Sequence, residues 1–576
     1  MRFRFTVLTY ALAGGVLAAG WAAAGLDLAS PFAKQADAAD NAKKTSNNGK
    51  SNGKDNDKNG GKGGGKNAKS NKSGAKSGAS ASLPPLKTAG DKLEFLEKIH
   101  RSFPARKVDT AFKVEELDRN LRHFMALPPE KYAPPASDET LVRRIYLDLT
   151  GRLPDGDTVK AYVADQSVAK RAKLVDKLLD SPEFGKYWGR YWRNVIFQKA
   201  TTMNKRRVDP QALEDWLAKE FNKNEGWDRI VCEMISATPK RDAKKDGNEW
   251  GQKYGPNNFV LAFENDAGEI ASQTARIFMG ISIQCAECHN HPFDKWKREQ
   301  FHEMAAFFSS GKYYMPDQQE PTKKTEIKAR FLLGEKPAPD LKPDALRVAV
   351  AAYLVYNPDN YWFARAFVNR IWGELVGDGF YSVDSLGPDK DCVYPIVVNR
   401  LAAVFRYKDF DVKWVFRTIM SSEAYLRSSR SISDPKELFS AVRPSRLRPD
   451  QVLNSLEHVV GSVPARTRRG VADAFAADLS ASQDSLEGSL QQALLMMNND
   501  ALQQALQKSR VRSYAVQAGS NDEAIRNTYL GVLAREPSSS EYERWRKMFK
   551  QTANRQDSVD DLLWVLVNST EFVTKR

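Results

Sequence analysis

The sequence predicts a mainly α protein with two helical domains, and two observations carry this prediction. Apolar residues recur at helical spacing over most of the chain after residue 85, whereas segments with the alternating pattern of a strand are scarce. At 576 residues the chain is also longer than a single core usually organises. We expect a signal peptide or N-terminal anchor at 1–39, a disordered Lys/Gly/Asn-rich linker at 40–85, helical domains at 86–312 and 346–576, and an interdomain segment at 313–345.

The first 39 residues have the composition of an export signal. Arg2 and Arg4 precede an uncharged run at 5–26 that is rich in Ala, Leu and Gly, and Ala36-Asp37-Ala38 matches a cleavage site. The run is also long enough to cross a bilayer, so an uncleaved segment would tether the protein to the inner membrane. We therefore expect an exported protein of the periplasm or cell envelope, either free or anchored.

The linker accounts for much of the positive charge. Residues 40–82 contain no aromatic and no large aliphatic side chain, so they cannot bury enough apolar surface to fold. Of the formal net charge of +15, residues 41–82 carry +8 and residues 83–576 carry +7. The remaining chain is only mildly basic and contains no nucleic-acid-binding motif, which argues against nucleic acid as a partner.

Amphipathic segments follow one another in the first predicted domain. Residues 169–181 place four aliphatic side chains on one face, with Lys and Asp opposite. Ser181-Pro182 opens an aromatic-rich helix, and another helix starts near Asp209 with a proline in its first turn. A later helix begins near Glu269 and is expected to carry the sequence CAECH at its end.

Residues 310–344 are rich in Pro and Lys and interrupt this pattern, as expected of an interdomain crossing with a short strand pair around 325–333. Helical spacing then returns and continues to the last residues. The stretches 145–184 and 528–572 resemble each other, because each has Tyr-Leu, a Pro-led turn into an amphipathic helix, and a Leu-rich helix ending Ser-x-Glu-Phe. Residues 419–425 repeat that ending in part. Duplication and common packing both explain this likeness.

The densest group of reactive side chains lies at 283–296, IQCAECHNHPFDKW, which holds two of the four cysteines and two of the six histidines. In a Cys-x-x-Cys-His haem site the two thiols add across the porphyrin vinyl groups and the histidine ligates iron. Here these residues would be Cys285, Cys288 and His289. Roughly 2 in 10,000 shuffled chains of this composition would contain the pattern. Haem of the c type is attached on the outer side of the membrane, so the predicted export agrees with this pattern. Haem c is therefore the favoured cofactor.

Two other chemistries fit the same stretch. A bare zinc or copper ion would use both cysteines with His289 or His291, and with His302 or Asp294. A disulfide between the two cysteines would close a small strained loop and leave both histidines unexplained. If haem is bound, the candidates for a further iron ligand near in sequence are His291, His302, Met304 and Met315.

Other residues have simpler explanations. Pro292 would end the preceding helix, and Asp294 would cap a helix starting near Lys295 or hold the ring of a ligating histidine. Cys232 and Cys392 are either separate buried thiols or a pair that staples the two domains. The chain contains no Gly-x-Ser-x-Gly, His-Glu-x-x-His or phosphate-loop motif. No catalytic residue is therefore identified.

Several motifs resemble a known pair of domains. RRIYLDLTGRLPDGDTVKAYV, LVDKLLDSPEFGKYWGRYW and QTARIFMGISIQCAECHNHPFDKW resemble the planctomycete cytochrome C-type domain of unknown function. NPDNYWFARAFVNRIWGELVGDGFYSVDSLGP, RPSRLRPDQVLNSL and ALLMMNND resemble its usual C-terminal companion, so that the likeness covers about 115–576. The resemblance implies an exported protein of unestablished activity, with its cytochrome label resting on CxxCH. Where similar chains have a Pro-Ser-His-Pro-like stretch, this chain has Tyr394-Pro395 and lacks the histidine.

Two functions are compatible with these observations. The first is an exported redox protein with one haem c that exchanges electrons with an unknown redox partner. The second is a non-redox envelope scaffold, or a protein that binds a glycan, another protein or an envelope polymer, with the Cys/His cluster as a structural metal site. Stacking of Trp and Arg on sugars would support the second function, although core packing is the simpler explanation. The residues concerned are Trp362, Arg365, Arg370, Trp372, Trp414 and Arg417.

Overall fold

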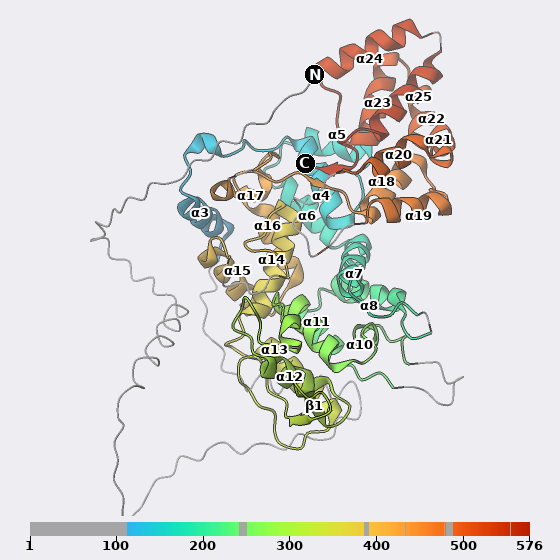
Figure 1. Cartoon of the computed structure of the whole chain (residues 1–576). Coiled ribbons are helices and arrows are strands. Elements are labelled where there is room, and N and C mark those ends of the chain that lie inside the picture. Colours follow the sequence, from blue (N-terminus) through green and yellow to red (C-terminus); the bar gives the residue numbers. More distant parts are fainter. Residues whose placement is uncertain are drawn as a thin grey trace, which may run out of the picture. The chain divides into compact units, whose positions relative to one another are not determined.

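In the computed structural model, the part of the chain that is described is mainly helical (Figure 1). No described helix is both long enough and apolar enough to span a membrane. The predicted signal or anchor at 1–39 and the predicted linker at 40–85 lie outside the described residues. Those residues are 112–204, 206–240, 250–384, 391–432, 434–476, 479, 488–552 and 554–576.

Three helices predicted in the first half, at 169–181, after Ser181 and after Asp209, are confirmed. Pro182 and Pro210 occupy first turns, and the side chain of Asp209 accepts a hydrogen bond from the Ala212 N–H. The elements are α3 (Val114–Met125), η3 (Pro129–Lys131), α4 (Asp138–Thr150), α5 (Gly156–Ala164), α6 (Lys170–Leu179), α7 (Pro182–Phe197), α8 (Pro210–Lys223), α9 (Trp227–Ile235), α10 (Asn257–Leu261), α11 (Ala267–Met279), η4 (Gln284–Glu287), α12 (Arg298–Ala305) and η5 (Ala306–Phe308).

A two-stranded antiparallel hairpin follows, formed by β1 (Tyr313–Pro316) and β2 (Lys324–Ile327). The strand pair predicted around 325–333 therefore lies further upstream, because the partner of Thr325 is Met315. Residues 328–333 continue as turn and coil.

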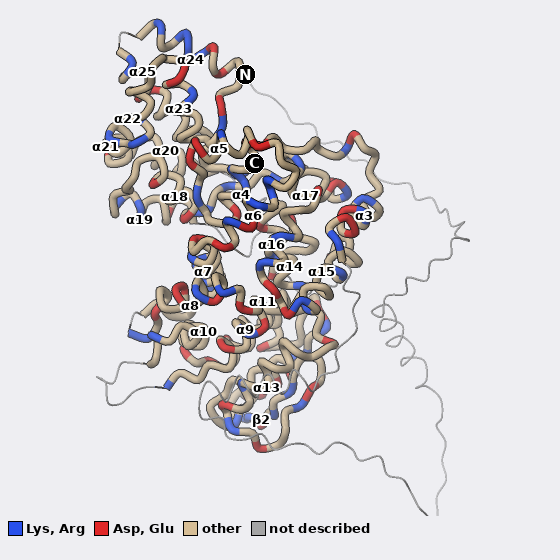
Figure 2. Tube along the Cα trace, turned by 180° about the vertical axis from the view of Figure 1, so that it is seen from behind, with Lys and Arg blue, Asp and Glu red and all other residues tan. Residues whose placement is uncertain are grey.

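The second half is again helical, and Figure 2 shows Lys and Arg interleaved with Asp and Glu along it. Its last strand, β4, pairs with β3. The elements are α13 (Pro343–Tyr356), α14 (Trp362–Val376), α15 (Pro395–Tyr407), α16 (Val412–Ser421), α17 (Glu423–Leu426), η6 (Pro435–Glu437), β3 (Ser445–Arg446), α18 (Pro449–Val460), α19 (Ala465–Ala474), α20 (Leu490–Asn498), α21 (Asp500–Gln507), α22 (Arg510–Val516), α23 (Asn521–Leu533), α24 (Ser539–Gln551), α25 (Arg555–Val567) and β4 (Thr574–Lys575).

The larger hydrophobic core joins residues on both sides of segment 313–345. Trp192 of α7 stacks on Phe367 of α14, with ring centroids 5.8 Å apart, and Trp227 of α9 lies 4.9 Å from the same ring. A second core holds most of the apolar residues from β3 to β4, together with Leu147 and Leu153. The two halves of the sequence therefore share one packed interior.

Most of the Trp and Arg side chains considered for polymer stacking are buried. Trp362, Arg365 and Arg370 are each 3% exposed, and Trp372 is 0% exposed. Trp414 packs edge-on against Phe112. Core packing therefore explains these residues apart from Arg417, whose side chain is 40% exposed and binds Asp176 at 2.6 Å. The buried rings cannot stack on a polymer.

The stretches 145–184 and 528–572 fold as similar three-helix units, α4–α6 and α23–α25. The first helix of each ends in a left-handed residue, Gly151 or Ala534. Each unit closes with an equivalent ion pair, Arg152–Glu183 at 3.2 Å and Arg535–Glu571 at 2.7 Å. The hydroxyls of Ser181, Ser569 and, in the partial copy, Ser422 each donate to the carbonyl three residues earlier. Packing alone does not require these matched polar contacts, so they favour duplication.

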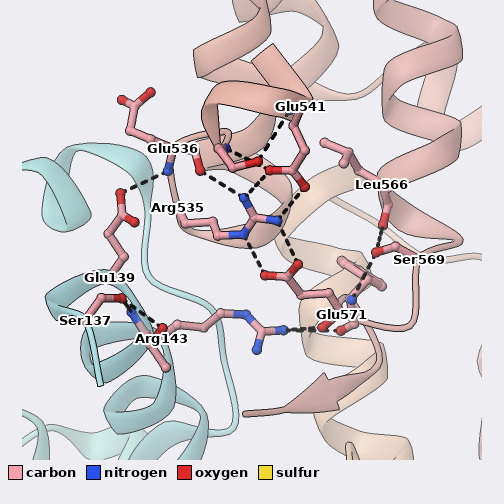
Figure 3. Close-up of polar contacts among 12 residues, drawn as sticks. Ser137, Glu139, Arg143, Arg535, Glu536, Glu541, Leu566, Ser569 and Glu571 are labelled. Atoms are coloured by element: carbon pink, nitrogen blue, oxygen red, sulfur yellow. Dashed lines mark hydrogen bonds and ion pairs between the residues drawn. The ribbon is translucent and has the colours of Figure 1, made fainter. Parts of the chain in front are cut away.

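The two units also contact each other, and Figure 3 shows the polar part of this contact. Glu139 of α4 accepts a hydrogen bond from the Glu536 N–H, 3.0 Å away. The buried guanidinium of Arg143 donates to the carbonyls of Glu571 and Thr574, at 3.0 and 2.9 Å. The end of the second unit is therefore held on α4 by backbone carbonyls.

The buried carboxyl of Asp228 at the start of α9 should make stability depend on pH. Burial raises its pKa from 3.8 to about 7. The folded state then binds more protons than the unfolded state between these values, so stability should fall as pH rises from about 4 to about 7. We expect the free energy of unfolding to decrease by on the order of 2 kcal/mol over this pH range. Relaxation and water penetration reduce the penalty of a buried charge, which limits the size of the effect.

Urea unfolding at pH 5 and pH 8 measures this effect. Asp228→Asn should remove most of the difference between the two pH values. Asp165→Asn, at an exposed site, is the control. An unchanged pH dependence in Asp228→Asn would show that other groups cause it.

Candidate functional site

The helix before CAECH stops earlier than expected. Asp266 caps α11 by accepting from the Glu269 N–H at 2.8 Å, and Gly280 ends it in the left-handed conformation with φ 66°. The Ile281 N–H then donates to the Ala275 carbonyl, which closes the helix end. The expectation that α11 carries the cysteines at its end is therefore wrong. They lie on and just after a separate turn, η4.

This turn presents three reactive side chains on the surface. Cys285, Cys288 and His289 are exposed, whereas Ala286 between them is fully buried. Both thiols are free, so no disulfide closes the turn. Cys232 and Cys392 are also separate thiols, the first buried and the second half-buried. The buried methyl group of Ala286 anchors the turn, while the two thiols face outward.

Three side chains from later elements hold the turn through its backbone. His302 of α12 and Arg298 contact the Glu287 carbonyl, at 3.0 and 3.2 Å. Gln318, in the loop between β1 and β2, donates to the Cys288 carbonyl at 2.7 Å. Sequence spacing gave no sign of Arg298 or Gln318, because their partners lie 11 and 30 residues away. The turn is therefore fixed before any ligand binds.

His302 acts as a structural link between the turn and the hairpin. Its Nε2 lies 3.0 Å from the Glu287 carbonyl, which only accepts, so Nε2 carries the proton. Its Nδ1 then accepts from the Tyr313 hydroxyl, also at 3.0 Å. Burial lowers the pKa of His302, which favours the neutral form of the ring. Both ring nitrogens are thus engaged within the protein.

The ring of His289 is oriented differently. Its Nδ1 lies 2.8 Å from the Asn290 carbonyl oxygen, so Nδ1 donates and the proton sits there. In that tautomer Nε2 bears a lone pair. A backbone carbonyl on one ring nitrogen is the usual way in which proteins orient a histidine that binds metal through the other.

The other candidate ligands are placed less favourably for binding at the surface. His291 is buried, and its Nδ1 accepts from the Phe293 N–H at 3.2 Å. Met304 is fully buried in the core, and Met315 is half-buried on β1. Among the described residues, no three His, Cys, Asp or Glu side chains are grouped closely enough to hold a metal ion.

The segment after the turn packs against the second half of the chain. Trp296 lies edge-on to Trp362, with ring centroids 5.7 Å apart, and the Lys295 ammonium lies 5.1 and 5.0 Å from the two rings. Phe293 is 72% exposed. Asp294 accepts from the Lys295 N–H, but α12 begins only at Arg298, so the predicted cap at Asp294 is wrong.

Two protein-family models match the chain. Residues 116–313 match the family PSCyt2, described as a protein of unknown function (DUF1549). Residues 347–474 match PSD1, described as a protein of unknown function (DUF1553). The chain belongs to the proteins that pair these two domains. The name PSCyt2 suggests a cytochrome-like domain, and neither description assigns an activity.

No curated protein and no solved structure matches the chain significantly. The CAECH turn and its contacts with α12 and the hairpin lie within the DUF1549 region or at its edge, and Trp362 lies in the DUF1553 region. The packing of Trp296 on Trp362 therefore joins the two domains beside the candidate site.

Proposed function

We propose that this paired-domain protein is exported, binds one haem c through Cys285, Cys288 and His289, and takes part in electron transfer in the cell envelope. The observation that carries the proposal is the ring of His289, which the Asn290 carbonyl holds with Nε2 as the unprotonated nitrogen. The composition of residues 1–39, which predicts an export signal, supports the location.

The residues present fit a covalently attached haem. Both thiols are exposed on one turn, where each would add across a vinyl group. A carbon–sulfur bond forms and the thiol hydrogen passes to the neighbouring vinyl carbon, so the addition needs no oxidant or reductant. Once bound, the haem supplies an iron that accepts and releases one electron.

Residues of the chain hold the haem-binding side chains in position and leave them accessible at the surface. His302, Arg298 and Gln318 fix the backbone that carries Cys288 and His289, so attachment would not require ordering the turn. Because the turn lies at the surface, a group bound there would be within reach of a redox partner.

Haem content tests the proposal directly. The full chain would be exported from cells with working c-type maturation, then denatured and examined by pyridine haemochrome spectrum and intact mass. We expect one haem per chain, retained after denaturation. Cys285→Ala with Cys288→Ala should lose it, whereas Cys392→Ala, which changes a cysteine away from the turn, should keep it.

Absence of haem from the folded, matured protein would refute the proposal. Metal analysis of the same sample would then separate two remaining identities. One equivalent of zinc or copper that disappears in the double variant would make the cluster a metal site. No metal would leave it as a pair of surface thiols.

A further inference from the structure

A second site is formed where α14 ends, apart from the CAECH turn. A cavity of about 200 Å³ is lined there by Gly373 and Glu374 of α14 and by the loop 377–383 that follows it. Val393, which precedes Tyr394, and Leu438 complete the apolar part of the wall. None of the residues of the CAECH turn lines this cavity.

Hydrogen bonds with Asn369 and close packing at two glycines hold the loop 377–383 in an irregular shape. The Asn369 carboxamide accepts from the Phe380 N–H at 2.7 Å and donates to the Tyr381 carbonyl at 2.9 Å. Gly377 has φ 102°, and a Cβ there would lie 2.7 Å from Arg443. A Cβ on Gly379 would lie 2.8 Å from the Tyr381 carbonyl. The wall of the cavity is therefore preorganised.

Three of the four charged side chains that line the cavity are paired, and the fourth, Asp391, is exposed to solvent, which screens its charge. Asp378 binds Arg443 at 2.8 Å, and Glu374 binds Arg448 and accepts from the Tyr191 hydroxyl. Arg370, which also lines the cavity, binds Asp384 at 2.5 Å. A ligand would meet many hydrogen-bonding groups but little net charge. This favours an uncharged, hydroxyl-rich molecule over an ion.

The volume of the cavity limits the size of the ligand. Pockets for drug-sized ligands span about 300–1,000 Å³, so this cavity accommodates a single ring. Val383, Val393 and Leu438 contribute aliphatic surface, whereas Phe380 and Tyr381 are 0% and 5% exposed and serve mainly to hold the wall. An aliphatic wall beside carboxylates and a guanidinium suits one face and the rim of a sugar ring.

We infer that this cavity binds one neutral sugar unit. The inference is independent of haem attachment. It adds to the protein a binding site in the DUF1553 half, where Glu374 and Arg370 contact ligand hydroxyls and the loop 377–383 encloses the ring.

Saturation-transfer difference NMR on the full chain tests this inference. The probes are D-glucose, D-galactose and N-acetylglucosamine, with glucosamine and glucuronate as charged comparisons. We expect a neutral sugar to bind with a Kd of about 1 mM, equivalent to about 4 kcal/mol. Ser382 lines the mouth of the cavity and is exposed, so Ser382→Trp should weaken binding at least about tenfold.

Two variants make the result decisive. Ser539→Trp makes the same change at an exposed serine on α24 and should leave binding unchanged. Asp391→Asn removes a negative charge from the wall and should alter sugar affinity less than about threefold. Binding of glucosamine alone, lost in Asp391→Asn, would overturn the neutral-sugar assignment. Failure of all neutral sugars, or binding that survives Ser382→Trp, would overturn the site.

Discussion

Replacing Lys575 by Met should lower the free energy of unfolding by about 3–5 kcal/mol. The Lys575 ammonium lies 2.8 Å from Asp148 of α4 and donates to the Glu374 carbonyl of α14 at 2.5 Å, and both charged side chains are about 5% exposed or less. Methionine preserves the length and apolar stem of lysine. It leaves the Asp148 carboxylate buried without its counter-charge, which is the main cost.

The measurement is urea unfolding of the wild type, the two single variants and the double variant Asp148→Asn with Lys575→Met. The double variant should be more stable than Lys575→Met, because no buried charge is left unpaired. Lys547→Met, at an exposed lysine on α24, is the control and should cost less than about 0.5 kcal/mol. A loss below about 1 kcal/mol in Lys575→Met would show that Asp148 does not depend on this partner.

The pairing of Lys575 with Asp148 also shows what sequence patterns cannot provide. The two residues are separated by 427 positions. Local signals correctly identified α7 and α8, because proline in the first turn and apolar spacing act within one helix. The sequences around Asp148 and around Lys575 contain no motif that indicates their contact. The pairing of β3 with β4 and the hydrogen bonds from Arg143 to the carbonyls of Glu571 and Thr574 bring the lysine to α4.

At the candidate site, too, the sequence predicts the features that depend on neighbouring residues and misses those that depend on distant ones. The spacing of Cys285, Cys288 and His289 identified the reactive group, since these residues are neighbours in sequence. The end of α11 was misplaced, although Gly280 is a recognisable stop signal, because the apolar pattern continues through Ile281 and Ile283. His302 was considered as a ligand, yet it holds the turn through the Glu287 carbonyl. Its role depends on folding α12 back onto η4.

No sequence motif indicated the cavity at the end of α14. Most of the Trp and Arg residues that suggested sugar binding are buried, while the cavity is built from backbone turns and mainly paired charges. Arg370 is the exception, because it was among those residues and does line the cavity. Its guanidinium is held there by Asp384 and by the Leu479 carbonyl.

Asp384→Asn should therefore be among the most destabilising single changes in the chain, at about 3–5 kcal/mol. Asp384 binds Arg276 of α11 and Arg370 of α14, each at 2.5 Å, and all three side chains are 6% exposed or less. The variant leaves two buried guanidiniums that face a neutral amide. Asp384 has φ 56°, and asparagine adopts this left-handed conformation as readily, so backbone strain does not add to the cost.

Urea unfolding measures the loss, and Asp409→Asn provides the matched control. Asp409 is exposed and also has positive φ, at 52°, so it tests the same substitution in the same backbone conformation without buried partners. We expect the control to change stability by less than about 0.5 kcal/mol. Because Arg276 belongs to the DUF1549 region and Arg370 to the DUF1553 region, a large loss in Asp384→Asn would identify this carboxylate as a main polar link between the paired domains. A loss no larger than that of the control would show that Asp384 does not carry this link, and that the apolar contacts, including Trp192 on Phe367, hold the domains together without it.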